Sequence, residues 1–407
     1  MKVRAVIAVP LVLLAVALAG GSVLVLRAFF LSVLLPLVSY LWTVLSLRGI
    51  SVTSEAPPGH CQVGRGFQQA VTVRNGSRFP GLWLRLEEFS DLPGRHDATV
   101  VNLAGRGSLR WDSQLDCRRR GRYTVGRVKV SASDPFGLFT RERVLGDRHE
   151  VLVYPATLEL PLFKAASFDE IGLGSGFQSV NLLSPNASSV REFYSGDSLN
   201  HIHWASTAHT GRLMVKMFDA DRSSTGSKTI WVVLDMMAGV QAGEGDESTE
   251  EYAVTLAASL AKKYLDAGMK VGLLAAGDAS ILVPPERGEE QLWRLLERLA
   301  VVRAEGQTPV GRLLVGRTDY LRGDSTVIIV TPSVSTAVFE AVRQLRSRVD
   351  GIVVVQLDPA SFGAATSALT AARNLGSTGV QVYLVHRGDE LGRALDHRIS
   401  LLPAGRT

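Results

Sequence analysis

The chain has 407 residues and a formal net charge of +5, and 46% of its residues are hydrophobic. This length suits two ordinary domains plus a further segment, and the composition excludes a disordered chain and a disulfide-stapled miniprotein. The 39 glycines and 16 prolines follow no period, which excludes collagen, and the two cysteines, Cys61 and Cys117, leave little scope for a cysteine-based metal site.

Positive charge is concentrated toward the N-terminus. Residues 1–49 carry four basic and no acidic side chains, residues 50–158 carry 16 basic and 11 acidic ones, and the remainder carries 24 and 28. This distribution favours a domain beside an anionic membrane surface over a nucleic-acid-binding domain, which would interleave basic and aromatic residues on one element. An ordinary solvated surface would give a similar pattern, so the charge alone does not decide the location.

Two long uncharged segments begin the chain. Residues 5–26 and 28–47 contain no charged side chain, and each is long enough to cross roughly 30 Å of hydrocarbon as a helix. A cleaved signal peptide has a shorter apolar region and is not followed by a second one of full length. The pair Gly20-Gly21 favours a turn between the two segments. Residues 1–48 are therefore predicted to form a transmembrane helical hairpin.

The charges that flank these segments predict their orientation. Lys2 and Arg4 precede the first segment and Arg48 follows the second, whereas Arg27 alone lies near the turn. The positive-inside bias places both ends of the hairpin in the cytoplasm, and the long side chain of Arg27 reaches the opposite interface. We expect a multi-pass bacterial plasma-membrane protein with its soluble domains, and two free thiols, in the cytoplasm.

Short alternating segments separated by turn signals occupy residues 49–158. Residues 70–73 (Ala-Val-Thr-Val) alternate, Asn75-Gly76 is a turn signal, and residues 82–86 form the next run. Further runs lie at residues 100–103, 107–111, 123–130 and 151–154. Short strands at this spacing indicate an antiparallel sandwich or a small barrel, and we predict an all-β sandwich domain.

Strand and helix patterns alternate in residues 229–407. Residues 230–234 are a continuous apolar run that ends at Asp235, as in a strand buried on both faces, and Ser248-Thr-Glu-Glu251 is a capping box that opens a helix. Further strands are predicted at 271–274, 327–330, 352–357 and 380–385, with helices at 289–301, 336–348 and 360–374. This order predicts an α/β doubly wound, mostly parallel sheet of five or six strands with helices on both faces.

Residues 159–228 form a connector with weak periodicity and an unusual sequence. It contains Val190-Arg-Glu-Phe-Tyr-Ser-Gly-Asp197, then Ile202-His-Trp204, Ala208 and Gly211-Arg-Leu-Met-Val-Lys216. This sequence resembles the signature of family 58 among the bacterial domains of unknown function, which runs Arg-Glu-Tyr-x-x-Gly-Asp, Ile-Asp-Trp, Ser-Ala-Arg and Gly-x-Leu-x-Val-Lys. Segments 134–139 and 153–155 resemble the upstream motifs of the family, so the resemblance covers nearly the whole chain.

The matches and departures divide the connector residues into two groups. The residues that match the family signature are Arg191, Glu192, Gly196, Asp197, Ile202, Trp204, Ala208 and Lys216. The residues that depart from it are Phe193, Ser198, His203 and His209. We expect Arg191, Asp197 and Trp204 to form a structural clasp between the sandwich and the α/β domain, through turn capping, a guanidinium fork and apolar surface. A partner-docking surface is the second interpretation and catalysis is the third.

Two further patterns in the connector are given non-functional interpretations. His201 and His203 would project to one face of an extended segment, but no acid or cysteine at a ligand-like spacing completes a metal site. The glycine run at residues 172–176 lacks the Lys-Ser/Thr of a phosphate-binding loop. We interpret it as a flexible connector.

The family resemblance also implies a von Willebrand factor type A domain for residues 229–407. Such domains often bind a divalent cation through an Asp-x-Ser-x-Ser motif, a Thr from a second loop and a later Asp. Here Asp235 holds the first position, Met236 and Met237 follow it without either Ser, Thr308 is the candidate second-loop Thr, and Thr331 stands where the later Asp would lie. Hard cations need several oxygen ligands, so we predict a degenerate site without metal or cofactor.

Proteins of the resembled family are commonly associated with AAA+ ATPases of the MoxR class and with transglutaminase-like membrane proteins. The resemblance therefore implies a membrane-anchored adaptor or assembly factor. No catalytic triad or paired-carboxylate arrangement with a diagnostic spacing supports an enzyme, and the charge distribution argues against a nucleic-acid partner. Because ligands meet doubly wound sheets at the carboxyl edge, the predicted partner-binding residues are Asp235, Met236, Met237, Thr308 and Thr331, with the methionines exposed.

Two other functions compete with the adaptor. One is a cell-envelope enzyme with a cleft around Arg191, Asp197 and His203, since clefts between domains are common sites. The other is an exported adhesion module, which predicts a disulfide between Cys61 and Cys117.

Overall fold

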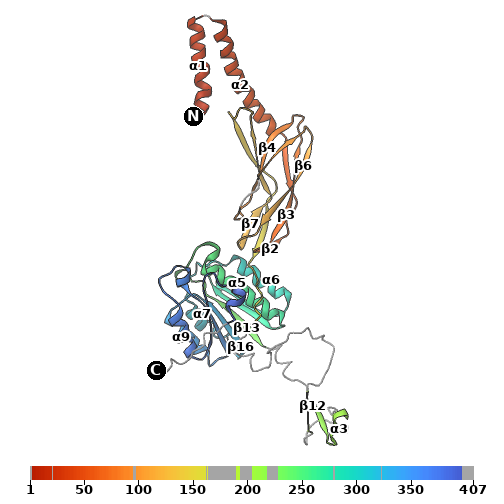
Figure 1. Ribbon diagram of the computed structural model, residues 1–407, viewed down its shortest axis with the longest axis vertical. Coiled ribbons are helices and arrows are strands. Elements are labelled where there is room, and N and C mark those ends of the chain that lie inside the picture. The colour runs from red at the N-terminus through yellow and green to blue at the C-terminus, as the bar shows by residue number, and fades with distance from the viewer. Residues whose placement is uncertain are drawn as a thin grey trace. The chain divides into compact units, whose positions relative to one another are not determined.

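The computed structural model describes residues 2–20, 22–94, 98–161, 163, 189–192, 204–217, 228–277, 280–321 and 323–396. The chain divides into two compact units, Met1–Pro155 and Ala156–Thr407 (Figure 1). In its described residues, the first unit holds two N-terminal helices and three small β-sheets, and the second holds a six-stranded sheet with its helices.

Two helices begin the first unit. Helix α1 spans Lys2–Gly20 and α2 spans Val23–Leu47, so the helix break falls at the paired glycines, as predicted. Among the described helices, α2 alone is long and apolar enough to cross a membrane, with a mean hydropathy of 2.1. The described apolar part of α1, Ala8–Gly20, is shorter. The structure therefore supports one candidate membrane span, where the sequence predicted two.

The β part of the first unit is antiparallel apart from one strand pair. One sheet has the order β1-β3-β6 (Ile50–Ser54, Gly66–Asn75, Ser108–Asp116), and a second has the order β5-β4-β8-β9 (Ala98–Leu103, Gly81–Phe89, Arg127–Ser133, Thr140–Leu145). The third has the order β2-β10-β7 (His60–Gln62, His149–Tyr154, Gly121–Val125), in which β10 runs parallel to β2. The prediction of a short-stranded β unit is confirmed.

The first two sheets share one apolar core. Alternate residues of a strand point to opposite faces, and the buried ones, such as Val73 of β3, Leu86 of β4 and Val130 of β8, meet in a single cluster. Leu47, the last residue of α2, belongs to the same cluster. Helix α2 also contacts β4, β8 and β9, so its C-terminal end is part of the β unit.

The second unit is built on a sheet with the strand order β15-β14-β13-β16-β17-β18. Its strands are β13 (Thr229–Leu234), β14 (Lys270–Ala276), β15 (Ser280–Glu286), β16 (Gly323–Thr331), β17 (Val349–Leu357) and β18 (Gln381–Val385). All neighbouring pairs are parallel except β14 and β15. The predicted mostly parallel α/β sheet is thus confirmed as a mixed sheet with an antiparallel edge strand.

Helices lie on both faces of this sheet. The helices are α5 (Thr249–Asp266), α6 (Glu289–Val301), α7 (Val310–Gly316), α8 (Thr336–Leu345), α9 (Leu369–Ser377) and α10 (Leu391–Ala394). Trp231 and Val233 of β13 share a core with α7, α8 and α9, whereas Leu256 and Leu260 of α5 lie outside that core. The strand order reverses between β13 and β16, and right-handed crossovers on either side of a reversal place helices on opposite faces.

Two segments of the second unit fall in or next to the predicted connector, residues 159–228. Residues 158–161 and 163 pack within this unit: the Leu158 N–H donates to Ser259 Oγ at 2.9 Å, and the Phe163 ring lies 5.0 Å from that of Tyr383. Strand β11 (Ser189–Glu192) pairs antiparallel with β12 (Met214–Met217), and α3 (Trp204–Thr210) lies between them in sequence. The described ends of the conspicuous sequence motif therefore lie on a two-stranded sheet and a short helix.

Candidate functional site

The carboxyl edge of the six-stranded sheet carries a buried polar network at the point where the strand order reverses. Asp235 follows β13, Thr331 ends β16, and these neighbouring parallel strands end at the same edge. Ligands of doubly wound sheets bind outside such a reversal, because the crossovers diverge there and leave a crevice. The sequence prediction placed its candidate residues at this position.

Asp235 is held by two hydrogen bonds. Its side chain is 2% exposed, Oδ2 accepts from Thr331 Oγ1 at 2.6 Å, and Oδ1 accepts from the backbone N–H of Met237 at 3.2 Å. Burial raises the pKa of Asp235 above its ordinary value of 3.8, and the bonds from Thr331 and Met237 offset part of that rise. The sequence analysis placed Thr331 where a later Asp would lie, and in the structure its hydroxyl donates directly to Asp235.

The network continues on both sides of Asp235. Thr331 Oγ1 accepts from the Ser333 N–H at 2.9 Å, and Gln356 Nε2 of β17 donates to the Ser333 carbonyl at 3.1 Å. On the other side, Gln241 Nε2 donates to the Asp235 carbonyl at 3.0 Å, and Gln241 Oε1 accepts from Thr249 Oγ1 at the start of α5 at 2.7 Å. Sequence reasoning missed Ser333, Gln356 and Gln241, because single polar residues at strand and loop ends form no recognisable motif.

Two loops above this network are bonded to each other. The Gly306 N–H donates to the Met236 carbonyl at 3.0 Å, and the Ala238 N–H donates to the Gly306 carbonyl at 2.9 Å. A Cβ atom at Gly306 would lie 2.2 Å from the Ala276 carbonyl oxygen, so only glycine fits this crossing. The loop after β13 and the loop that carries Thr308 therefore form one fixed surface.

The predicted partner-binding residues fall into two groups by exposure. Asp235, Met236 and Thr331 are 2%, 1% and 0% exposed, so their side chains lie beneath the surface. Met237 and Thr308 are half-buried and reach the surface. The prediction of exposed methionines is therefore wrong for Met236, whose apolar side chain is drawn into the core next to β13.

The described residues offer little to a metal ion. They contain no group of three or more His, Cys, Asp or Glu side chains placed to hold one. Both carboxylate oxygens of Asp235 accept hydrogen bonds, and the Thr331 hydroxyl occupies the place of the expected second acid. A hard cation needs several free oxygen ligands, which this arrangement of Asp235 does not offer.

The matched connector residues are only partly described. Trp204 begins α3 and is 68% exposed, and Ala208 on the same helix is also exposed. For Arg191 and Glu192 on β11, and Lys216 on β12, the backbone alone is described. Gly196, Asp197, Ile202, Phe193, Ser198, His201, His203 and the glycine run at 172–176 lie outside the described residues.

His209, the remaining departure from the signature, is exposed on α3.

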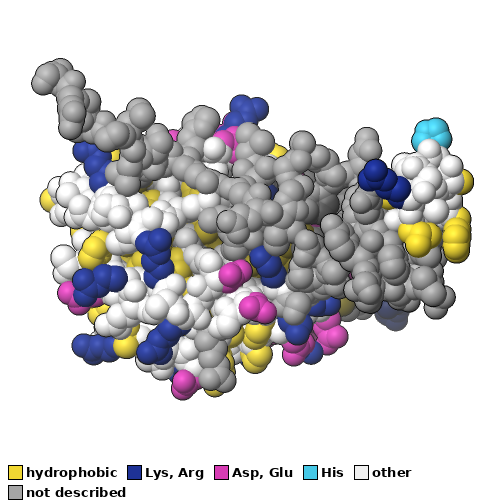
Figure 2. Space-filling view, turned by 90° about the horizontal axis from the view of Figure 1, so that it is seen from below, with side chains coloured by type: hydrophobic (Ala, Val, Ile, Leu, Met, Phe, Trp, Pro, Cys, Tyr) yellow, Lys and Arg dark blue, Asp and Glu magenta, His cyan; other side chains and the backbone are white. Residues whose placement is uncertain are grey.

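The charged side chains form no single-sign group among the described residues in Figure 2, where basic and acidic side chains are interspersed. A nucleic-acid-binding surface would instead concentrate basic side chains. The described basic side chains on this face therefore do not gather into one patch.

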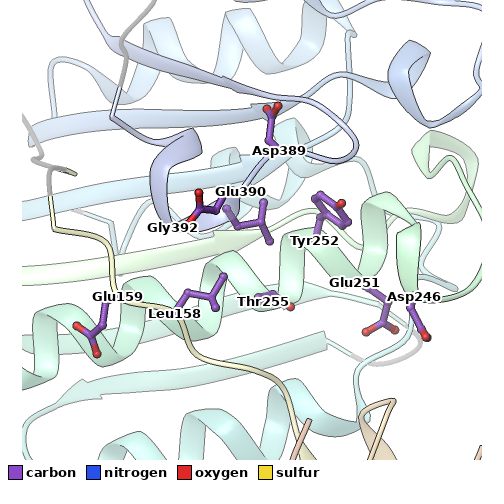
Figure 3. A pocket seen from close by; sticks show the side chains of 10 residues that line it. Leu158, Glu159, Asp246, Glu251, Tyr252, Thr255, Asp389, Glu390 and Gly392 are labelled. Atoms are coloured by element: carbon purple, nitrogen blue, oxygen red, sulfur yellow. The ribbon is translucent and has the colours of Figure 1, made fainter. Parts of the chain in front are cut away.

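A pocket of about 550 Å³ in the second unit was not predicted from the sequence (Figure 3). It is lined by Leu158, Glu159, Asp246, Glu251, Tyr252, Thr255, Asp389, Glu390, Leu391 and Gly392. Tyr252 Oη accepts from the Gly388 N–H at 3.1 Å, which holds the loop after β18 against α5. Three segments far apart in the sequence build this pocket, so no local motif could reveal it.

The chain is similar to bacterial proteins of undescribed function. It is 22% identical over 312 residues to the uncharacterized protein YeaD of Bacillus subtilis (strain 168), a match that covers 74% of this chain and 75% of YeaD. It is 29% identical over 140 residues to the uncharacterized protein Rv1480 of Mycobacterium tuberculosis (strain ATCC 25618 / H37Rv), which covers 34% of this chain and 39% of that protein.

Solved structures share only limited similarity with the chain. Proximal thread matrix protein 1 from the mussel byssus is 14% identical with a TM-score of 0.30, over 41% of this chain and 46% of that one. The ASH/PapD-like domain 7 of human CEP192 is 10% identical with a TM-score of 0.19, over 26% of this chain and 84% of that one. In sequence, residues 189–362 match the model of a family described as protein of unknown function DUF58.

Proposed function

We propose that the protein is a membrane-anchored adaptor or assembly factor rather than an enzyme. In this proposal the N-terminal residues form a transmembrane hairpin with both ends in the cytoplasm, and the α/β unit is a von Willebrand factor A-like domain. The carboxyl edge of its sheet binds a protein partner, a MoxR-class AAA+ ATPase. A transglutaminase-like membrane protein is a further partner.

The observation that supports this function is the fixed surface above Asp235. The loops that carry Met237 and Thr308 are bonded through Gly306 and supported by the buried bond between Asp235 and Thr331. A preformed surface loses little conformational entropy on binding, which favours protein recognition. Its exposed atoms come from Met237, Ala238 and Gly239 of one loop and from Gln307 and Thr308 of the other.

The choice of partner follows from the resemblance of residues 191–216 to the DUF58 signature and from the family match over residues 189–362. The candidate membrane helix α2 supports the anchoring of the chain. An adaptor of this kind would hold a soluble ATPase at the membrane, where the ATPase meets its membrane-bound substrates.

Site-specific photocrosslinking in native cells tests this proposal. A photoreactive residue is placed at Met237 or Thr308 on the carboxyl edge, and the matched control is placed at Asp324, which is exposed at the amino end of β16. We expect an AAA+ ATPase, identified by mass spectrometry, to crosslink from Met237 and Thr308 and not from Asp324. An equal yield from all three positions, or no ATPase from any, would contradict the adaptor function.

A further inference from the structure

A second pocket, of about 450 Å³, lies at the C-terminal end of α2 in the unit Met1–Pro155. Its lining residues are Val44, Leu47, Arg48, Arg141, Glu142 and Arg143. Arg48 directly follows α2, whereas Arg141 and Arg143 belong to β9, the edge strand of its sheet. The fold therefore brings three arginines to one pocket from segments far apart in the sequence.

The register of β9 explains why two of these arginines share a direction. Arg141 pairs with Ala132 of β8, and Arg143 pairs with Val130. Residues directly opposite in a ladder point to the same face of the sheet, and Ala132 and Val130 are both buried in the core. Arg141 and Arg143 therefore point to the core side at the open edge of the sheet, where α2 contacts β9.

The pocket carries an uncompensated positive charge. Among the described residues, no acidic side chain forms an ion pair with Arg48, Arg141 or Arg143, all of which are exposed, and the Arg141 guanidinium lies 5.6 Å from the centre of the Tyr40 ring. Glu142 also lines the pocket, but its carboxylate lies 2.7 Å from Lys129 Nζ. Three positive groups are thus available to an anion.

The length of α2 places this pocket at the depth of the lipid headgroups. A helix rises about 1.5 Å per residue, so roughly 20 residues cross about 30 Å of hydrocarbon. Counted from Val23, that span ends near Trp42, and the next turn brings Val44 to Arg48 into the headgroup layer. This step rests on the proposed membrane insertion of α2.

A rigid aromatic loop lies beside the pocket. The Asp134 carboxylate accepts the N–H of Phe136 at 2.9 Å and that of Phe139 at 2.6 Å, which fixes the loop 134–139 noted in the sequence. The Phe139 ring packs against Tyr40 of α2 at 5.8 Å, and the Phe136 side chain is 63% exposed. Aromatic side chains at this depth are typical of the membrane interface.

We propose that this pocket binds the phosphate of an anionic phospholipid headgroup. The planar forks of Arg48, Arg141 and Arg143 suit phosphate oxygens, because guanidinium groups donate paired hydrogen bonds to them. Val44, which is half-buried, offers apolar contact to the glycerol and the first methylenes of the lipid. A free phosphate ion shares the headgroup chemistry but lacks this apolar contact. The site would fix the β unit at the bilayer surface.

The test measures phospholipid binding to the detergent-solubilised full chain. Phosphatidylglycerol, phosphatidylcholine and inorganic phosphate are each titrated against the wild type and against the triple variant Arg48→Gln, Arg141→Gln and Arg143→Gln. We expect the wild type to bind phosphatidylglycerol at least about tenfold more tightly than phosphatidylcholine, and the triple variant to lose that preference. Millimolar inorganic phosphate should not displace the phosphatidylglycerol.

A charge-matched control separates the pocket from general electrostatics. It changes Arg110, Arg118 and Arg122 to Gln, which are exposed on the same unit and paired with acids. The control should keep the preference for phosphatidylglycerol. An equal loss of the preference for phosphatidylglycerol in both triple variants would contradict a lipid site in this pocket. Displacement of the lipid by inorganic phosphate would contradict the assignment of the ligand as a lipid.

The arginines could instead prevent edge-to-edge pairing of β9, because inward-pointing charges protect edge strands. In that case the pocket variant would self-associate in sedimentation experiments and still bind phosphatidylglycerol like the wild type, which would overturn the proposal.

Carbonate extraction of membranes that contain the wild type or the pocket variant tests the anchoring separately. A pocket variant that resists extraction but has lost the preference for phosphatidylglycerol would agree with both the membrane anchoring and the lipid site. Extraction of the wild type from the membrane would contradict the proposed anchoring itself.

Discussion

At the scale of single residues, Asp235 shows how burial changes the chemistry of a side chain. Its position after an apolar run was predictable from the sequence, because buried parallel strands read as continuous apolar segments. Its bond to Thr331 was not, since β13 and β16 are far apart in the chain and only the sheet register brings them together. Thr331 was placed by analogy with a metal ligand, and the structure makes it a hydrogen-bond donor.

The raised pKa of Asp235 predicts a pH-dependent stability. Because the folded state holds the proton more tightly than the unfolded state, the stabilisation is present below pH 3.8 and is lost as pH rises through the folded-state pKa. Asp235→Asn cannot titrate, so the variant should gain stability relative to the wild type as pH rises from 4 to 7. Thermal unfolding of the full chain in detergent at four pH values measures the difference.

The control for this prediction is Asp324→Asn, which changes an exposed carboxylate at the opposite edge of the sheet. The pH dependence that Asp235→Asn shows beyond that of this control is assigned to Asp235. An equal pH dependence in the two variants would contradict the raised pKa of Asp235.

At the scale of elements, local signals predicted where several strands and helices begin. The predicted helix start is confirmed: Ser248 is the N-cap of α5, and its Oγ accepts from the Glu251 N–H. The edge strand β15 was missed, because Pro284 and Pro285 argue against a central strand and are tolerated only at an edge. Helix α7 was missed as well, since seven residues are too few for a periodic pattern.

The helix predicted at residues 360–374 is displaced toward the C-terminus. A short 3₁₀ helix, Pro359–Phe362, ends at Gly363 with a φ of 100°, and α9 begins only at Leu369. The Asp358 carboxylate accepts from the Ala368 N–H at 2.6 Å, a contact across ten residues that stabilises the intervening loop. The hydrophobic pattern could not show this boundary, because the loop is fixed by one buried side chain.

The crossing of the two surface loops makes a prediction at this scale. Gly306→Ala should destabilise the chain by about 2 kcal/mol or more, because the added methyl group collides with backbone oxygens. Gly316→Ala is the matched control: it lies in α7 and its Cβ would meet open space, so it should stabilise by up to about 1 kcal/mol. Urea unfolding of both full-length variants measures the change in the free energy of unfolding. Equal changes in the two variants would contradict the close contact of the Gly306 loop with its neighbours.

At the scale of the whole molecule, the sequence predicted the order of a β unit followed by an α/β unit. It did not predict that residues 158–163 belong to the second unit. Phe163 is buried against Tyr264 and Tyr383, which are far away in sequence. Such a contact depends on the tertiary fold and leaves no periodic signal in the segment itself. The family signature likewise gave no indication of the arginine pocket, whose residues come from α2 and β9.

The two thiols test the predicted orientation. Cys117 is 1% exposed, and burial together with the neighbouring Cys61 thiol raises its pKa, so it should react only in the unfolded chain. Cys61 is half-buried and should react in the folded chain. In intact cells a membrane-impermeant maleimide should label neither thiol, and permeabilisation should expose Cys61 alone. Labelling of Cys61 in intact cells, or a disulfide between the two residues, would favour the exported adhesion module.

The most direct test of the adaptor function is the affinity of the nanodisc-embedded full chain for a purified MoxR-class ATPase from the same bacterium. The informative variant is Gly239→Arg on the exposed loop after β13, and its matched control is Gly316→Arg, exposed at the end of α7. We predict that the wild type and Gly316→Arg bind equally and that Gly239→Arg binds at least about tenfold more weakly. Absence of binding by the wild type, or equal binding by both variants, would contradict a partner surface at the carboxyl edge of the sheet.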